Sequence, residues 1–452
     1  MSGQTLFSVS SVNDSPETPR GILKRREVLA YGAGDVAASL VWNAVSAFAL
    51  IFYTDVALLP AAALGTLFFF TRIFDAFFDV AIGLSVDRTT SRWGKARPYL
   101  LYGAVPFAVL GVATFYVPDA SENMRFLYAA ITYFLLGLLL SVVTIPYSAM
   151  LPMMSSHHKD TVDLSAARSV ATSVGVIVVT ALFLPGVEYF GQGDAQQGYL
   201  IMAAIVSMAA LVMLLTCFSL CKERVQPVAA NKLEIKTDVS RMFRNRAWNT
   251  ASGFALLNFI RFGALLSLTP FFAINVLQQP WTISVLLPAL SGTLLVGAFI
   301  ARPFLSRFGT IKTDSVALIA GAILFGLLPL FESEPVIFLT LYVLSSLVIS
   351  ITMTSIYAMA AEAVDYHQAL FGTRQEGLLA AGVSLAIKIG MAVGTAGVAW
   401  ALAFSGYSPQ AVPENAISTM RWLYYGLPLV VFALQFICIR FYPADQASAR
   451  TS

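Results

Sequence analysis

Charge is what this sequence lacks most. Asp, Glu, Lys and Arg together make up 12% of the 452 residues, hydrophobic residues make up 58%, and the mean hydropathy is +0.75. A soluble domain carries about 25% charged residues, because its surface must face water. Apolar runs long enough for the roughly 20 residues of a spanning helix recur along the whole chain. The composition therefore excludes a soluble protein and indicates one embedded in a lipid bilayer.

Cysteine and histidine are also scarce, with three residues of each. Cys217 and Cys221 lie four apart on one predicted helix without a histidine beside them, so we expect neither a metal site nor a cofactor. The phosphate loop of ATP-driven transporters and a nucleophile–base constellation are both missing, so we expect no enzymatic activity. The net charge is only +3 and the basic residues are scattered, which argues against a nucleic-acid partner.

The hydrophobic pattern predicts about twelve transmembrane helices in two groups of six. The expected spans are 28–53, 58–84, 98–117, 126–152, 165–187 and 196–221, then 249–276, 281–305, 314–332, 335–362, 376–405 and 420–441. The corresponding domains are a tail at 1–27, a bundle at 28–221, a linker at 222–247, a bundle at 248–442 and a tail at 443–452. Two bundles of six around a basic linker are typical of transporters with parallel repeats.

The distribution of positive charge predicts the orientation, because cytosolic loops are enriched in Lys and Arg. Every second connection is basic: the N-terminal tail with Lys24, Arg25 and Arg26; the loop with Arg88, Arg92, Lys95 and Arg97; the linker; and the loop with Arg307 and Lys312. The alternate loops are mostly acidic. We therefore expect a multi-pass plasma-membrane protein with both termini in the cytosol and no cleavable signal peptide.

Ionisable residues inside the spans are the candidates for function, because each costs at least about 2.5 kcal/mol at the bilayer centre. They are Asp35, Arg72, Asp75, Asp79, Arg168, Arg261 and Lys388. Asp75 and Asp79 lie four residues apart, so their carboxylates share one helix face. Such a pair binds sodium through its oxygens or takes up a proton. The alternative is an ion network with Arg72 that only holds helices together.

The remaining intramembrane charges allow more than one interpretation. Asp35 lies near the cytosolic end of its span, where a gate or a pairing role is as plausible as substrate contact. Arg168, Arg261 and Lys388 have apolar neighbours and should face the interior of the protein. They either contact substrate or form salt bridges between helices.

The sequence around the aspartate pair resembles that of a known transporter family. The segments that carry the likeness are 72–79, Gly83, 87–88 and 91–98, with further matches at 31–34, 53–55, 145–147, 151–152, 363–366 and Lys388. They are similar to the melibiose permease family, the glycoside–pentoside–hexuronide:cation symporters of the major facilitator superfamily. The likeness covers nearly the whole chain, and it implies the major facilitator fold and cation symport.

The resemblance also implies roles for individual residues. Asp75 and Asp79 match the cation-binding carboxylates, and Ser141 falls where a threonine contributes to that site. Arg168 and Lys388 match charged residues near the sugar pocket and the path to the cation. Phe78 replaces an asparagine that precedes the second carboxylate in melibiose transporters, which removes a sodium ligand and favours a proton.

The sugar pocket departs further from the family pattern. Ser39 and Thr144 stand where relatives have sugar-binding carboxylates, and Ser148 and Met353 stand where relatives have stacking tryptophans. The charged residues left for the pocket are Arg168, Lys388 and, by hypothesis, Arg261, with Asp35 opposing them. Cationic side chains in a cavity favour an anionic ligand, so a uronide or sulfonated sugar is the expected substrate.

The sequence therefore predicts a monomeric symporter, driven by protons or sodium ions, that imports a small polar solute by alternating access. Arg88, Arg92 and Lys95 are expected to form an inner gate with Glu362 or Asp365. A transporter of a lysophospholipid-like or other anionic amphiphile is the alternative. A membrane sensor or enzyme is disfavoured, because no added soluble domain or catalytic constellation is present.

Overall fold

The secondary structure in the computed structural model is entirely helical over the residues it describes, which are 23–155, 157–225, 235–372 and 375–443. The first six helices are α1 Arg25–Ile51, extended by a π turn at Phe52–Val56, α2 Ala61–Arg88, α3 Arg97–Ala113, α4 Glu122–Met154, α5 His158–Gly191 and α6 Ala195–Leu220. A short helix, α7 Ile235–Arg244, lies within the predicted linker. The remainder are α8 Arg246–Asn275, α9 Ile283–Leu327, α10 Pro335–Phe371, α11 Glu376–Phe404, α12 Glu414–Arg421 and α13 Leu427–Ile439, with short turns at Pro280–Thr282, Leu328–Phe331 and Trp422–Gly426.

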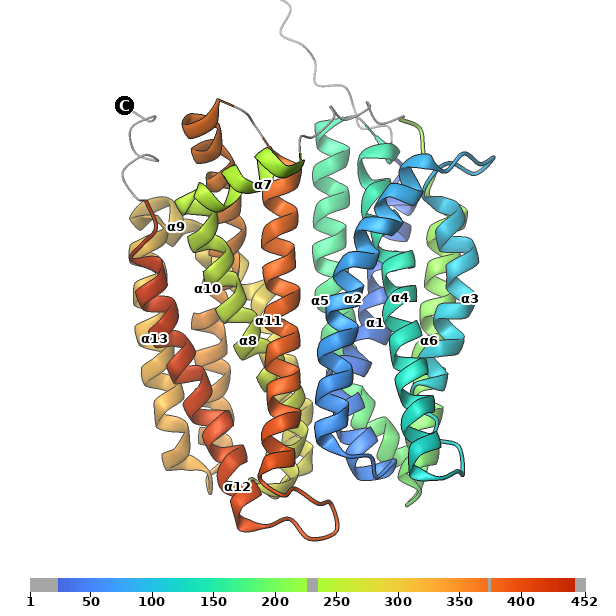
Figure 1. The fold of residues 1–452 in the computed structure, drawn as a ribbon, viewed down its shortest axis with the longest axis vertical. Helices are drawn as coiled ribbons and strands as arrows, with labels where there is room; N and C mark the ends of the chain where they lie inside the picture. Colours follow the sequence, from blue (N-terminus) through green and yellow to red (C-terminus); the bar gives the residue numbers. More distant parts are fainter. Residues whose placement is uncertain (1–22, 156, 226–234, 373–374, 444–452) are drawn as a thin grey trace, which may run out of the picture.

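The helices form two groups that stand side by side (Figure 1). Helices α1–α6 make the N-terminal group and α8–α13 the C-terminal group. Helix α7 lies at one end of the molecule and α12 at the other, and these are called the α7 end and the α12 end below. The two groups meet chiefly where α2 packs against α11 and α5 against α9.

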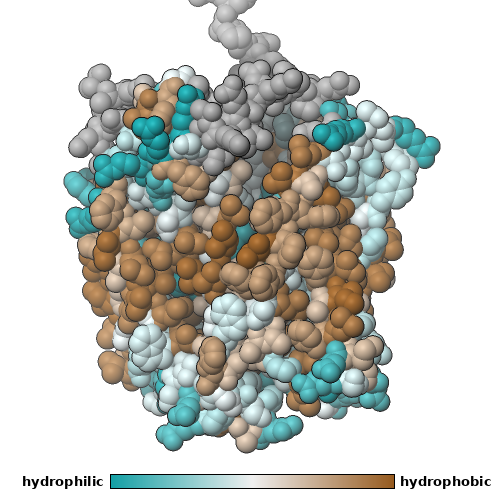
Figure 2. All heavy atoms as spheres, in the orientation of Figure 1, coloured by the Kyte–Doolittle hydropathy of each residue, from teal (hydrophilic) through white to brown (hydrophobic). Residues whose placement is uncertain are grey.

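The outer surface matches a bilayer environment. On the face shown in Figure 2, an apolar band crosses the middle of the molecule, and hydrophilic side chains collect toward its two ends. Nine segments of the described chain have the length and composition to cross a membrane, and the 17-residue α3 is a shorter apolar helix. Helices suit this environment because each satisfies its own backbone hydrogen bonds where no water is present. The predicted all-helical membrane fold is confirmed, whereas the number of crossings and their sidedness stay predictions.

Helix α9 contains two of the predicted spans. It is broken at Gly309, whose backbone angles of φ 74° and ψ 167° are not helical. This combination is essentially restricted to glycine, because a Cβ atom would clash with the backbone. Gly309 therefore redirects the chain between the two halves of α9.

We predict that Gly309→Ala lowers the free energy of unfolding by about 1–3 kcal/mol through backbone strain alone. A Cβ at this position would meet no other atom within 4 Å. Gly326→Ala is the matched control, because Gly326 is helical and equally open, and alanine favours helix there. The measurement is the thermal unfolding midpoint of both variants in detergent. Equal midpoints for the two variants would contradict the assignment.

Candidate functional site

Lys388 joins the two helix groups by binding both predicted cation-site carboxylates. Its Nζ lies 3.0 Å from Oδ2 of Asp75 and also contacts Oδ2 of Asp79. Asp75 and Asp79 lie on one face of α2, and Lys388 lies in the middle of α11, which packs against α2. The hydroxyl of Ser141 on α4 donates to Oδ1 of Asp75 at 2.5 Å. The structure thus brings Asp75, Asp79, Ser141 and Lys388 into one cluster.

The cluster is shielded from solvent and carries an unbalanced charge. Asp75 is only 4% exposed, and the side chain of Lys388 is 25% exposed. Two carboxylates against one ammonium leave a formal charge of −1 when all three groups are ionised. An uncompensated charge in such surroundings is costly. One further monovalent cation, or one proton, would make the cluster neutral.

Arg72 does not supply that compensation. Its guanidinium lies over the ring of Trp42, 3.9 Å from the ring centroid, rather than against Asp75. The positive partner of the carboxylates comes instead from the other helix group. Among the described residues, no group of three or more His, Cys, Asp or Glu side chains is arranged to hold a metal ion.

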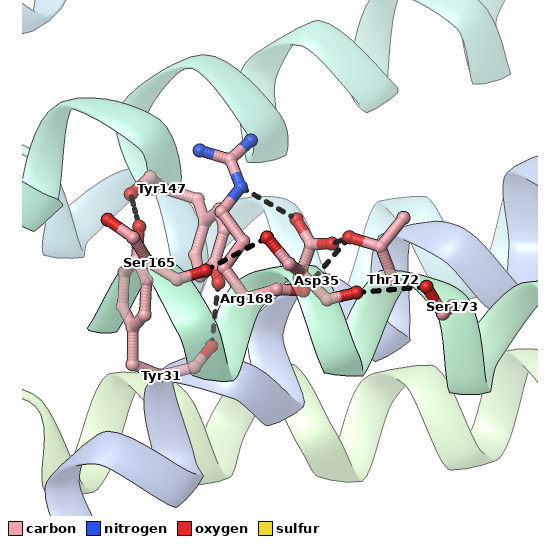
Figure 3. A network of polar contacts seen from close by, with 8 residues as sticks. Tyr31, Asp35, Tyr147, Ser165, Arg168, Thr172 and Ser173 are labelled. Carbon is pink, nitrogen blue, oxygen red and sulfur yellow. Dashed lines mark hydrogen bonds and ion pairs between the residues drawn. The ribbon is translucent and has the colours of Figure 1, made fainter. Parts of the chain in front are cut away.

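A second charged cluster centres on Arg168 of α5 (Figure 3). Nε of Arg168 lies 3.3 Å from Oδ1 of Asp35 on α1, and the hydroxyl of Thr172 donates to the other oxygen of Asp35. The guanidinium also lies 5.3 Å from the centroid of the Tyr147 ring. Asp35 therefore has the pairing role that the sequence left open, and this pairing does not test its role in substrate binding.

Tyr31 and Tyr147 fix the base of the Arg168 cluster. Their rings stack with centroids 4.5 Å apart, and each hydroxyl donates to the backbone carbonyl of the other residue. This arrangement leaves the two terminal nitrogens of Arg168 pointing away from Asp35 (Figure 3). The Arg168 side chain is 37% exposed although it lies within a membrane helix. A guanidinium held through Nε presents its terminal fork to an oxyanion.

The hydrogen bonds recorded for the other predicted substrate-binding residues are with residues outside these two clusters. The backbone carbonyl of Ser39 accepts from Asn43, and the hydroxyl of Thr144 donates to Leu140 in its own helix. Arg261 is 5% exposed and lies inside the C-terminal group, where it donates to Asn258 and lies over the ring of Phe432. The substrate-binding roles of Ser39, Thr144 and Arg261 stay predictions.

The predicted gate residues lie at the α7 end. Glu223, which follows α6, accepts hydrogen bonds from the backbone N–H groups of Lys95, Ala96 and Arg97 at the start of α3. Gly94 has a positive φ of 111°, and a Cβ there would overlap the Glu223 carboxylate. These contacts hold the basic loop against the N-terminal group.

Two other gate residues, Arg92 and Glu362, have partners within their own helix group. The guanidinium of Arg92 lies over the Trp93 ring, Arg88 is exposed, and Glu362 accepts a hydrogen bond from Tyr442 at 2.6 Å. Asp365 is not unpaired either, because it too has an interaction partner. An inner gate formed by Arg88, Arg92 and Lys95 with Glu362 or Asp365 therefore stays a prediction.

At the α12 end a hydrogen-bonded contact joins the two groups. The hydroxyl of Tyr407, in the loop after α11, lies 3.1 and 3.0 Å from the two carboxylate oxygens of Asp55. Burial and the neighbouring Asp55 carboxylate raise the pKa of the Tyr407 phenol, so it remains a protonated donor. Close by, the indole of Trp400 donates to Thr66 and packs against Phe69.

Recorded side-chain contacts join α2 to α11 at the α12 end, through Trp400 and Thr66, and in the middle of the molecule, through Lys388.

Three tyrosines lie at or near these contacts but have no role in the site predicted from the sequence. Tyr147 supports Arg168, and Tyr407 joins the helix groups. Tyr357 of α10 is 66% exposed and lies within electrostatic reach of Arg168 across the two groups. Tyr357 lies one helical turn beyond Met353, which takes the place of a stacking tryptophan, and that spacing is the signal that could have identified it.

We predict that Tyr407→Phe loosens the α12 end, because the variant keeps the ring but loses the hydroxyl that donates to the half-buried Asp55 carboxylate. Spin labels at Ala62→Cys and Gln410→Cys, on opposite sides of this contact, should show a longer-distance population that rises several-fold. Tyr189→Phe is the control, since Tyr189 is exposed at the same end and its ring contacts Phe190 of its own helix. An unchanged distance distribution in Tyr407→Phe would refute this role.

Comparison with known proteins agrees with the fold and with a transport function. The family model described as "MFS/sugar transport protein" matches residues 30–446. The putative glycoside/cation symporter YagG of Escherichia coli (strain K12) is 32% identical over 94% of this chain and 93% of its own. A glucuronide carrier protein homolog of the same organism is 32% identical, covering 93% of each chain.

A solved structure shows the same fold at low sequence identity. The bacterial homologue of the human lysosomal transporter Spinster, in an inward-facing and unoccupied conformation, aligns with a TM-score of 0.69 at 13% identity. The alignment covers 93% of this chain and 98% of that one. The chain belongs to the MFS/sugar transport protein family and is a multi-pass transporter of the plasma membrane, not an enzyme.

Proposed function

We propose that this protein is a symporter that couples one monovalent cation, a proton rather than sodium, to uptake of a sugar derivative with an acidic group. The observation that carries the proposal is the binding of Lys388, from one helix group, to Asp75 and Asp79 of the other. The relative named as a glycoside/cation symporter supports the general class.

The charge of the Lys388 cluster accounts for coupling. With Lys388 in place the cluster carries a formal charge of −1, so it has room for one positive charge. A proton or ion bound there competes with the ammonium for the same oxygens and weakens the link between the helix groups. Cation occupancy is then linked energetically to the rearrangement between inward and outward states.

The ligands near the carboxylates favour a proton. Sodium, a hard cation, needs several oxygen ligands. Ser141 supplies one hydroxyl, already bonded to Asp75, and Phe78 brings no oxygen beside Asp79. A proton needs only one carboxylate oxygen.

The Arg168 cluster supports an acidic substrate. Asp35 neutralises Arg168 electrostatically, so the case for an anion rests on geometry: the terminal nitrogens form a planar fork that fits a carboxylate or sulfonate. The exposed ring of Tyr357 supplies an apolar face for a sugar. The relative named as a glucuronide carrier homolog is consistent with a uronide.

The orientation of the chain in the membrane follows from its charge. The basic loops with Arg88, Arg92 and Lys95 and with Arg307 and Lys312 lie at the α7 end, which we assign to the cytosol. Both clusters come from one chain, so we propose the monomer as the transporting unit.

We predict that Asp79→Asn abolishes cation-driven accumulation and leaves counterflow within a few-fold of wild type. In the variant Lys388 neutralises Asp75 alone, so the cluster no longer has charge to bind a cation. The measurement compares accumulation of a uronic acid with its counterflow in proteoliposomes. Glu188→Gln, an exposed acid at the end of α5, is the control and should behave as wild type. Intact accumulation and cation dependence in Asp79→Asn would rule out coupling at this carboxylate.

We predict that Arg168→Lys weakens binding of an acidic sugar by about tenfold or more, because lysine keeps the charge but loses the bidentate fork. Binding of a matched neutral glycoside should change much less. The test is competition of counterflow by a uronide and by its neutral parent sugar. Arg244→Lys, an exposed change on α7, is the control. An equal loss for both sugars would remove the case for an acidic substrate.

A further inference from the structure

An apolar pocket opens beside the bend of α9, away from both charged clusters. Its volume is about 730 Å³, within the range of roughly 300–1,000 Å³ found for small-ligand sites. Side chains from both halves of α9 form most of its wall, including Phe304 and Phe308 before Gly309 and Val316 and Ala320 after it. Val348 and Ile351 of α10 complete the wall.

The surface around this pocket faces the hydrocarbon of the bilayer. Phe304, Phe308 and Val316 are large apolar side chains that are exposed on the protein. The segment Phe299–Phe331 has the length and composition to cross a membrane. In a membrane protein, such an exposed apolar surface contacts lipid chains rather than water.

Two basic side chains line one side of the pocket. Lys312, three residues after the bend, and Arg440, which caps α13, both line it and are both exposed. Arg440 lies over the ring of Phe436, 4.7 Å from its centroid. No ion pair of either side chain with an acid is recorded among the described residues. The positive charges are therefore available to an anion.

We propose that this pocket binds one anionic glycerophospholipid of the surrounding bilayer. An acyl chain occupies the apolar part, and the phosphate lies between Lys312 and Arg440. The guanidinium of Arg440 suits phosphate oxygens, and basic residues near the membrane surface attract anionic lipid headgroups.

A bound lipid would also bear on the bend at Gly309. The pocket includes residues from both halves of α9, so its occupant contacts the two segments that the glycine separates. The position at the α7 end places the headgroup in the leaflet that we assign to the cytosol. The pocket shares no lining residue with the Lys388 cluster or the Arg168 cluster.

The test measures retained lipid by native mass spectrometry of the full-length protein in detergent. Wild type is supplied with phosphatidylglycerol, with phosphatidylcholine of the same acyl chains, or with glycerol phosphate lacking chains. We expect retention of phosphatidylglycerol over phosphatidylcholine, and no retention of glycerol phosphate. The double variant Lys312→Gln/Arg440→Gln should retain about tenfold less phosphatidylglycerol.

Two further variants separate a pocket from a merely basic surface. Ala320→Phe fills the apolar part and should also lower phosphatidylglycerol retention about tenfold, with both cations in place. The control Lys159→Gln/Arg244→Gln removes two exposed cations outside the pocket and should retain lipid as wild type does. Equal retention of the two lipids by wild type, or undiminished retention in either pocket variant, would overturn the proposal.

Discussion

The structure depends on how charge is compensated inside a membrane. Asp75 and Asp79 lie on a helix that must cross the bilayer, and neither carboxylate is stable there without a positive partner. That partner, Lys388, comes from the other half of the molecule. The carboxylates of one helix group are therefore compensated by an ion pair with the other group. Any cation that neutralises the carboxylates acts on that ion pair.

The contacts toward the two ends of the molecule differ in which helix groups they join. At the α12 end, Tyr407 and Trp400 join the helix groups through Asp55 and Thr66, while at the α7 end Glu223 holds the basic loop before α3 within the N-terminal group. The terminal nitrogens of Arg168 point away from its partner Asp35 (Figure 3). A substrate bound at Arg168 and a cation bound at Asp79 thus both act on the boundary between the same two groups.

Much of this arrangement could be predicted from sequence because the governing signals are local. Apolar runs predicted helices, and the spacing of Asp75 and Asp79 placed them on one face. Contacts between distant segments have no such signal: Lys388 and Asp75 are 313 residues apart. Arg72, one turn from Asp75, was the local candidate for neutralising the pair, but its guanidinium packs on Trp42 instead. Helix α7 was not expected, because a short polar helix lacks the apolar run that identified the others.

The central claim is that one cation enters the Lys388 cluster for each substrate molecule transported. The most direct test is the reversal potential of substrate flux in proteoliposomes, with proton and sodium gradients imposed separately. A proton gradient should balance the substrate gradient at a ratio of one proton per substrate molecule, whereas a sodium gradient should have little effect. Substrate flux that responds to neither gradient would contradict this claim.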